Sequence, residues 1–426
     1  MSAINNLRQN LDSGNLDEAL LRIYTEASLP SQKERYAEIL DTFESLYGSD
    51  GDVRLFSAPG RTEIGGNHTD HNHGKVLAAS INLDTVAAAA ARDDNIICEK
   101  SAGHEMNKVD LSDLEPNEKE YGLSSALIRG MCAGFRKNGY NIGGFNSTGI
   151  TQVLSGSGLS SSAAFEVLIG TILNYLYNDG NVSSVEIAKI AQFAENEYFG
   201  KPSGLMDQMA CSVGGFISID FKDIKNPVVE KIDFDFAATG HSLCIVDTKG
   251  SHADLTDEYA AVRREMENAA SVFDKSVLRE VDENDFYKKI PEIRAKFGDR
   301  AVLRATHFYN ENRRVDELKA ALADNDFETF KSIITESGHS SFMFNQNVFA
   351  PFQPKVQPVS VALSICERVL RGRGAWRVHG GGFAGTIQAF VPDDMLCVFS
   401  DEIEAVFGEG SCHILKIRPF GGIEIK

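Results

Sequence analysis

Several features that are common in other classes of protein are scarce in this sequence. Basic residues are outnumbered, with 42 Lys and Arg against 61 Asp and Glu, so the formal net charge is −19. Such a chain repels phosphate backbones and anionic lipid surfaces, because these ligands are bound mainly through basic patches. We therefore expect no nucleic-acid partner and no membrane partner.

Cysteine is sparse and irregularly spaced. The seven cysteines are dispersed, odd in number and never arranged as CxxC, which argues against a disulfide framework and against a zinc site. No stretch approaches the roughly 18 apolar residues of a membrane span. The polar N-terminus lacks the basic start and apolar core of a signal peptide. We expect a cytoplasmic protein with reduced, buried thiols.

Internal repeats, low-complexity tracts and Pro-rich linkers are also missing, so any domain boundary is subtle. Apolar residues at helical spacing predict two or three short helices in the first 48 residues. Strand-like and helical stretches then alternate, which favours mixed α and β layers. We predict an N-terminal domain over residues 1–240, with a helical extension over about 1–48, and a C-terminal domain over residues 241–426.

A Gly/Ser-rich turn at residues 155–162 separates a β-rich run from a helical pattern. Gly156 and Gly158 would let the backbone approach a phosphate closely, and a helix N-terminus favours an anion. The serines at 160–162 add hydroxyls for phosphate oxygens or Mg²⁺. The turn lacks the GK[ST] of a Walker loop, and a serine-capped helix after a flexible turn is the alternative interpretation.

Two carboxylates stand in apolar surroundings further along the chain. Glu195 falls near the apolar side of a helix that begins near Ser183, where a buried carboxylate needs a partner or a metal such as Mg²⁺. The alternative is an ion pair with a nearby Arg or Lys. Asp207 lies in the first turn of an apolar segment, where it could accept a substrate proton or simply interact with the helix dipole.

Residues 57–80 concentrate polar side chains in a loop punctuated by glycine. This composition suits the recognition of a hydroxyl-rich ligand, since each hydroxyl needs a donor or an acceptor. Two alternatives are a metal cluster of His68, Asp70, His71 and His73, and a solvated polar loop.

A second glycine-rich segment, RVHGGGFAG, lies near the C-terminus. Gly380, Gly382 and Gly385 match the dinucleotide-binding pattern GxGxxG, but the following TIQAFV alternates like a strand rather than continuing as a helix. We predict a strand–turn–strand hairpin here and reject a dehydrogenase.

Four segments, taken together and in order, resemble the signatures of galactokinases, a family of GHMP kinases. APGRTEIGGNHTDHNHGKVL is similar to the galactokinase signature, GSGLSSSAA to the ATP-loop motif, ENEYFGKPSGLMDQ to the segment ending in MDQ, and RVHGGGFAG to the third GHMP motif. The resemblance implies a two-domain α+β GHMP-kinase-like fold with the active site in the inter-domain cleft. It also implies ATP-dependent phosphorylation of the anomeric hydroxyl of galactose.

The resemblance further implies a role for each matching residue. Asp207 would be the catalytic base, and Arg61 beside it would keep it ionised and stabilise the transferring phosphoryl group. Ser162 and Glu195 would hold Mg²⁺. The nucleotide-binding residues would be Ser155, Gly156, Ser157, Gly158, Leu159, Ser160 and Ser161. The sugar would contact Asn67, His68, Asp70 and Tyr259. We expect a monomer whose partners are ATP and a small sugar.

The chain departs from the family pattern at several positions. The family's Glu before the conserved His is Asn67 here, and its Asn two places after the Arg is Glu63. Loss of a negative charge at position 67 would suit a 6-carboxylate. Galacturonate and N-acetylgalactosamine are therefore alternative substrates. His71 replaces a Tyr, His379 a Thr and Ala384 a Gly.

A third hypothesis is a regulator that binds sugar and ATP without turnover. A relative of that kind is expected to have lost Asp207 or part of the serine loop. Neither is missing from this sequence, so an active kinase is the leading hypothesis.

Overall fold

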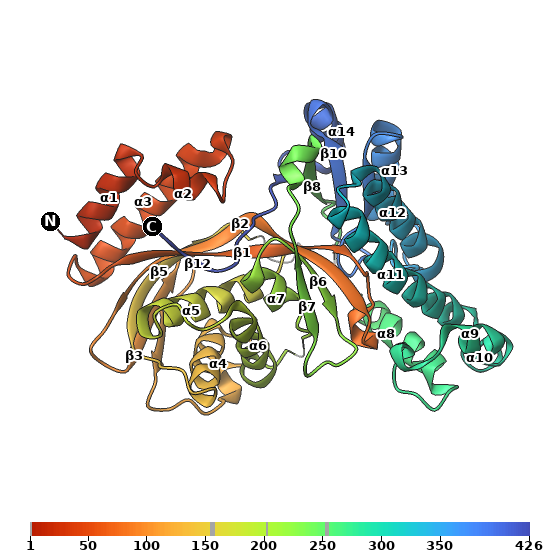
Figure 1. Cartoon of the computed structure of the whole chain (residues 1–426), viewed down its shortest axis with the longest axis horizontal. Helices are drawn as coiled ribbons and strands as arrows, with labels where there is room; N and C mark the ends of the chain where they lie inside the picture. Colours follow the sequence, from red (N-terminus) through yellow and green to blue (C-terminus); the bar gives the residue numbers. More distant parts are fainter. Residues whose placement is uncertain (1, 154–157, 202, 252–254) are drawn as a thin grey trace.

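The computed structural model describes residues 2–153, 158–201, 203–251 and 255–426. Its strands gather in an eight-stranded and a four-stranded sheet, and helices pack around both (Figure 1). This arrangement confirms the predicted α+β class.

The larger sheet is built on two long antiparallel strands, β1 (Arg54–Gly65) and β2 (Lys75–Ala91). Its other strands are β3 (Ile96–Ser101), β4 (Asn107–Asp110), β5 (Phe145–Thr151), β6 (Phe216–Asp220), β7 (Val228–Ile232) and β12 (Ile423–Ile425). The strand order is β12-β1-β2-β5-β3-β4. Because β2 is so long, β5 pairs with its second half while β6 pairs with its first half and with β7.

Helices cover both faces of this sheet (Figure 1). One layer contains α1 (Ala3–Ser13), α2 (Asp17–Leu21) and α3 (Leu29–Tyr47), and the other contains α4 (Ser124–Lys137), α5 (Ser161–Tyr177), α6 (Ser184–Ala194) and α7 (Met206–Val213). Successive strand side chains point to opposite faces. Val86 and Ala88 accordingly pack with the first layer, whereas Ala87 and Ala89 pack with the second.

The smaller sheet has the order β11-β8-β10-β9. Its strands are β8 (His241–Asp247), β9 (Ala375–Val378), β10 (Thr386–Pro392) and β11 (Cys412–Leu415). Strands β9 and β10 pair antiparallel across the glycine run, so the predicted hairpin is confirmed. Leu77 and Ala79 of β2 share a buried cluster with Leu243 and Ile245 of β8, which ties the two sheets together.

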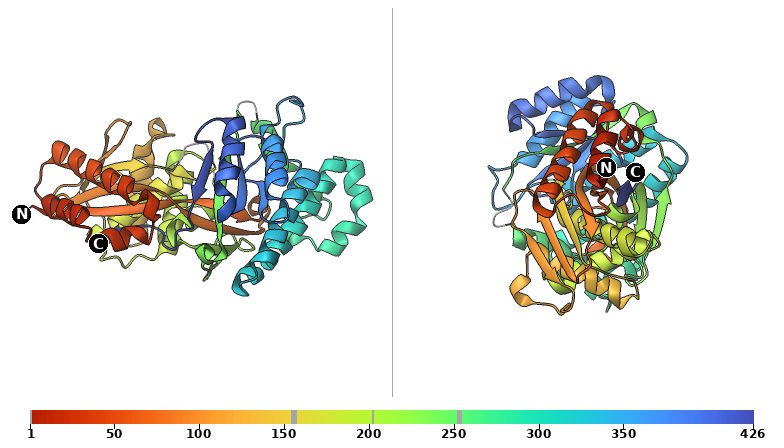
Figure 2. Two further views of the ribbon diagram at one scale, coloured as in Figure 1. Left: turned by 90° about the horizontal axis from the view of Figure 1, so that it is seen from above. Right: turned by 90° about the vertical axis from the view of Figure 1, so that its left-hand side faces the viewer.

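The remaining helices pack on the sheets or on one another. They are α8 (Thr256–Ser271), α9 (Glu283–Lys288), α10 (Ile290–Phe297), α11 (Asp299–Ala323), α12 (Phe327–Ser340), α13 (Pro358–Leu370) and α14 (Leu396–Phe407). Figure 2 shows that α9 and α10 lie at the opposite end of the molecule from α1–α3. Within the described ranges, no helix combines the length and the apolar composition needed to cross a bilayer.

After β11 the chain leaves the smaller sheet, and its final strand, β12, pairs with β1. The C-terminus therefore lies beside the N-terminal helices (Figure 1). The boundary expected near residue 240 falls between β7 and β8. The division into residues 1–240 and 241–426 stays a prediction, and β12 is an exception to it because this strand completes the first sheet.

Gly421, just before β12, offers a test of this closure. An added Cβ would lie 1.8 Å from the carbonyl oxygen of Ser212 at the end of α7. We expect Gly421→Ala to lower the free energy of unfolding by about 3 kcal/mol or more, because β12 must shift. Gly298→Ala is the control: its φ is +87° but no atom lies within 4 Å of the added Cβ, so only the backbone strain of about 1–2 kcal/mol applies. Equal losses in urea unfolding would contradict the prediction.

Candidate active site

The predicted base, Asp207, lies in the first turn of α7 against the guanidinium group of Arg61. Nε and Nη2 of Arg61 donate hydrogen bonds to Asp207 Oδ1 at 2.8 and 2.6 Å. The Ser160 hydroxyl donates to the other carboxylate oxygen. Burial would raise the pKa of Asp207, but the charge of Arg61 and these hydrogen bonds outweigh it and lower the pKa below its ordinary value. The carboxylate is therefore ionised at neutral pH and can accept a proton.

Arg61 reaches this position because β1 is irregular just before it. The β1–β2 register shifts between Pro59 and Arg61, and such an irregularity re-aims the side chains that follow. An added Cβ at Gly60 would lie 2.7 Å from the carbonyl oxygen of Leu159, so only glycine fits here without displacement. The Arg61 N–H donates to that same oxygen at 3.1 Å, and the guanidinium group donates to the Gly158 carbonyl. The strand and the end of the glycine–serine loop are thus held together.

The glycine–serine loop is described only in its second part. Ser155, Gly156 and Ser157 lie outside the described residues. Gly158 has a φ of +73°, a conformation that favours glycine, and Leu159 is fully buried. Ser161 begins α5, which matches the predicted order of strand, loop and helix. Since Ser160 bonds to Asp207, the N-terminus of α5 lies beside the carboxylate, where an anionic group would be favoured.

Glu195 follows α6 and is 2% exposed, as the apolar pattern of that helix predicted. Its Oε1 accepts a hydrogen bond from Ser162 Oγ at 2.9 Å and pairs with Lys201 Nζ at 2.8 Å, and its Oε2 accepts from Gln208 Nε2 at 2.7 Å. The alternative of an ion pair with a lysine is therefore present in the structure. The Ser162 hydroxyl and the carboxylate also form an oxygen pair of the kind that Mg²⁺ takes beside nucleotide phosphates.

Metal binding by the protein alone finds no support in the described part of the chain. No group of three His, Cys, Asp or Glu side chains there could hold a metal ion. This finding goes against the alternative of a metal cluster in residues 68–73. It also means that a Mg²⁺ ion at Ser162 and Glu195 would need oxygen ligands from a nucleotide and from water.

Glu63 and Asn67, two of the departures from the family pattern, contact each other. Asn67 is fully buried, and its Nδ2 donates to Glu63 Oε1 at 2.9 Å and to the Gly380 carbonyl at 2.7 Å. Asn67 Oδ1 accepts from Asn347 Nδ2 at 2.9 Å. Glu63 pairs with the fully buried Arg377 at 2.7 Å. Both polar atoms of Asn67 are engaged inside the protein, and its role as a sugar contact stays a prediction.

Two other residues predicted to contact a sugar, His68 and Tyr259, lie at the glycine turn of residues 380–382. The His68 ring and the Tyr259 hydroxyl each form a hydrogen bond of 2.9 Å with a carbonyl oxygen of this turn. Burial raises the pKa of Asp70, and repulsion from other carboxylates, including Asp207, adds to this effect, whereas His68 opposes it. The structure therefore brings His68 and Tyr259 to the same glycine turn, and the part of Asp70 in sugar binding stays a prediction.

His379 is a functional candidate whose position the sequence did not reveal. Its Nδ1 and Nε2 lie 3.0 and 3.1 Å from the hydroxyls of Thr386 and Thr62, and the ring is almost fully buried. Burial and the nearby charges of Arg61 and Arg377 hold its pKa well below the ordinary value, so the ring is neutral. His379 thus joins the glycine hairpin to β1 through these two hydroxyl groups.

Known proteins resemble this chain in both sequence and fold. The galactokinase galactose-binding signature matches residues 41–91, and the N-terminal domain of the GHMP kinases matches residues 126–215. Galactokinase of Streptomyces coelicolor is 32% identical over 81% of this chain and 86% of that protein. Galactokinase of Actinobacillus pleuropneumoniae is 30% identical over 82% and 88%. The crystal structure of Lactococcus lactis galactokinase with galactose superposes with a TM-score of 0.74, at 25% identity over 90% of this chain and 98% of that chain.

The fold and the arrangement of its site define a GHMP kinase. Within this class, the chain belongs to the galactokinase family. These two relatives match over more than four-fifths of this chain and of their own length.

The buried pair of Glu63 and Arg377 yields a prediction. We expect Arg377→Met to lower the free energy of unfolding by about 3–5 kcal/mol, because it leaves Glu63 buried without a cation. Arg368→Met is the matched control, since Arg368 pairs with Glu402 at the surface at 2.6 Å. The control should leave the free energy of unfolding almost unchanged, because exposed ion pairs contribute little. Similar midpoints for the two variants in urea unfolding would show that the buried pair is unimportant.

Proposed function

We propose that this protein transfers the γ-phosphoryl group of ATP to the anomeric hydroxyl of galactose. The observation that carries the proposal is the ionised Asp207, held by Arg61 and Ser160 beside the N-terminus of α5. A base in this position suits proton removal from a sugar hydroxyl, and the helix start suits the phosphates. Membership of the galactokinase family supports galactose as the sugar.

In the proposed reaction, Asp207 accepts the proton of the C1 hydroxyl as the C1 oxygen attacks the γ-phosphorus. The bond between the γ-phosphorus and the β,γ-bridging oxygen breaks, and the products are galactose 1-phosphate and ADP. Arg61 keeps Asp207 ionised and offers positive charge near the transferring group. Ser162 and Glu195 would hold Mg²⁺, which when bound neutralises phosphate charge.

The binding roles belong to the same proposal. Phosphate binding falls to residues 155–161, and the sugar hydroxyls bond to His68, Asp70 and Tyr259. Asn67 supports the sugar site through its hydrogen bonds to Glu63 and to the glycine turn. Burial raises the pKa of Tyr259 to about 12, so its phenol keeps the proton that it donates to the glycine turn, and its oxygen can accept a hydrogen bond from a sugar hydroxyl.

We propose further that ATP and a small sugar are the partners of a cytoplasmic monomer. All seven cysteines are free, which suits a reducing compartment.

The proposal predicts that ADP is released from Mg-ATP in the presence of galactose, and much less with galacturonate, N-acetylgalactosamine or glucose. Asp207→Ala should lower kcat by about 100-fold or more, because it removes the base. The control Asp316→Ala removes an exposed carboxylate that pairs with Lys75 and should leave kcat unchanged. A preference for another sugar would replace the substrate but keep the chemistry. ATP binding without turnover of any sugar would overturn the proposal in favour of a regulator.

The Arg61–Asp207 pair also predicts the pH dependence. Because Arg61 lowers the pKa of Asp207, the base is active at neutral pH and kcat/KM falls only when the pH drops through that low pKa. Arg61→Ala should move this acidic limb upward by about one to three pH units. Arg61→Lys keeps the positive charge and should leave the limb close to its wild-type position. An Arg61→Ala profile that is lower in rate but unchanged in shape would contradict this assignment.

A further inference from the structure

The fully buried carboxylate of Asp84, on β2, joins the N-terminal helices to the C-terminal segment. Its Oδ2 accepts hydrogen bonds from the Tyr24 hydroxyl at 2.6 Å and from Arg418 Nη1 at 3.1 Å. Its Oδ1 accepts from Arg35 Nη2, on α3. Burial would raise the pKa of Asp84, but the two arginines outweigh this effect and lower it. The contact is therefore an ion pair that involves the N-terminal extension directly.

The backbone of Asp84 lies next to two segments that lead into the candidate active site. In the β1–β2 ladder it pairs with Pro59, at the irregularity that re-aims Arg61. Its carbonyl oxygen accepts the N–H of Gln152 at 2.9 Å. Gln152 follows β5 and leads toward the glycine–serine loop. The backbone of Asp84 thus contacts both the strand that carries Arg61 and the first described flank of the loop.

Helix α3 makes a second polar contact at the same place. Gln32 is 5% exposed, and its Nε2 donates to Gln152 Oε1 at 3.2 Å. The next residue, Val153, packs so closely on Gly60 that an added Cβ there would lie 2.9 Å from Val153 Cγ1. A shift of Gln152 would therefore be transmitted to Gly60 and to its neighbour Arg61.

These polar groups are costly where they stand. Nε and Nη1 of Arg35 and Oε1 of Gln32 are buried and have no hydrogen-bond partner among the described residues. Buried polar atoms without partners destabilise a fold, and apolar side chains of similar size would often hold a helix on a sheet at least as well. Arg35 neutralises the buried carboxylate of Asp84, but stability alone gives no reason for Gln32 or for the unpaired atoms of Arg35. The residues that Gln32 and Arg35 contact do offer a reason, because Gln152 and Asp84 adjoin the glycine–serine loop and the strand that carries Arg61.

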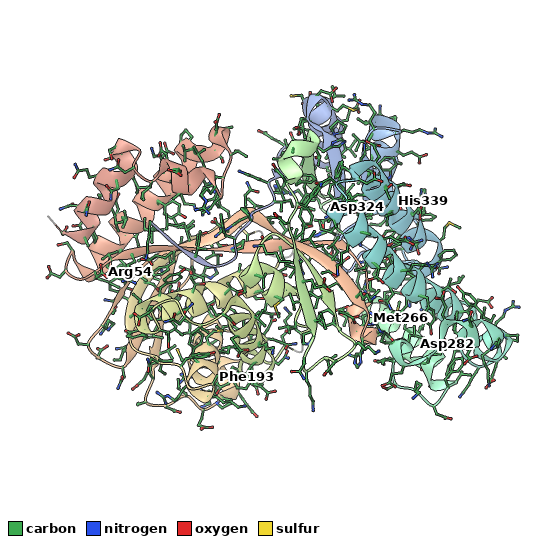
Figure 3. All side chains as sticks on the ribbon, viewed as in Figure 1. Arg54, Phe193, Met266, Asp282, Asp324 and His339 are labelled. Atoms are coloured by element: carbon green, nitrogen blue, oxygen red, sulfur yellow. The ribbon has the colours of Figure 1, made fainter. Side chains whose placement is uncertain are left out.

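We propose that Gln32 and Arg35 are positioning residues of the kinase site, which hold Gln152 and Asp84 and through them the loop flank and Arg61. The inference rests on the proposed function. It assigns a part in catalysis to the N-terminal extension, most of which precedes the matched family ranges 41–91 and 126–215. Figure 1 shows α3 lying along the outer face of the sheet, and Figure 3 shows Arg54, at the start of β1, beneath this layer.

The test compares nucleotide binding with sugar use in Gln32→Ala. We expect the Kd for Mg-ADP and the KM for ATP to rise about three- to tenfold, the effect of losing one hydrogen bond that orients the site. The KM for galactose and the Tm should stay at their wild-type values. Gln152→Ala should give the same increase, and the double variant should show no further increase, because both changes remove the same contact. Arg35→Lys should raise the Kd for Mg-ADP less than Arg35→Met does, because lysine keeps the positive charge next to Asp84.

Lys33→Ala is the matched control, since Lys33 lies next to Gln32 on α3 but pairs with Asp17 at 2.6 Å within the extension. Its nucleotide affinity should equal that of the wild type. An unchanged Mg-ADP affinity in Gln32→Ala would overturn the inference. A lower Tm together with equal changes for ATP and galactose would also overturn it, since that result indicates a purely structural role. Failure of the proposed function would appear separately, as a wild-type protein without galactose turnover, and the Mg-ADP titration would still be decisive.

Discussion

Helices cover both faces of β1 and β2, so a charged side chain on these strands has little contact with water and must find a partner inside the protein. The resulting contacts are Arg61 with Asp207, Glu63 with Arg377, and Asp84 with Arg35 and Arg418. Each partner comes from a distant part of the chain, so the pairing of charges also joins the layers. The candidate catalytic pair is one of these contacts, and the same requirement that organises the interior therefore organises the chemistry.

Local sequence patterns were sufficient for the parts of the site that depend on one helix. Helix α6 begins next to Ser183, as predicted, and the Ser183 side chain accepts the N–H of Glu186. This start places Glu195 at the buried end of the helix. Asp207 stands in the first turn of α7, again as predicted. Such features follow from spacing over a few turns, which the order of apolar and polar residues records directly.

Contacts between distant segments could not be predicted in this way. Nothing in the local spacing around Arg377 or Asn347 indicates that they meet Glu63 and Asn67. The sequence marked Glu63 and Asn67 as departures from the family, but only the structure shows that the acid and the amide are hydrogen-bonded to each other. Strand β12 is three residues long, too short for a periodic pattern, and its pairing with β1 is set by the fold of the whole chain.

The pairing of β12 with β1 has a consequence for folding during synthesis. Because β12 follows every other strand in the sequence, the first sheet stays open along β1 while all the later segments are being synthesised. A nascent chain that stalls before β12 presents an unpaired strand edge. Such an edge can pair with other chains. The edge of β1 is therefore covered only after β12 has been synthesised and has paired with it.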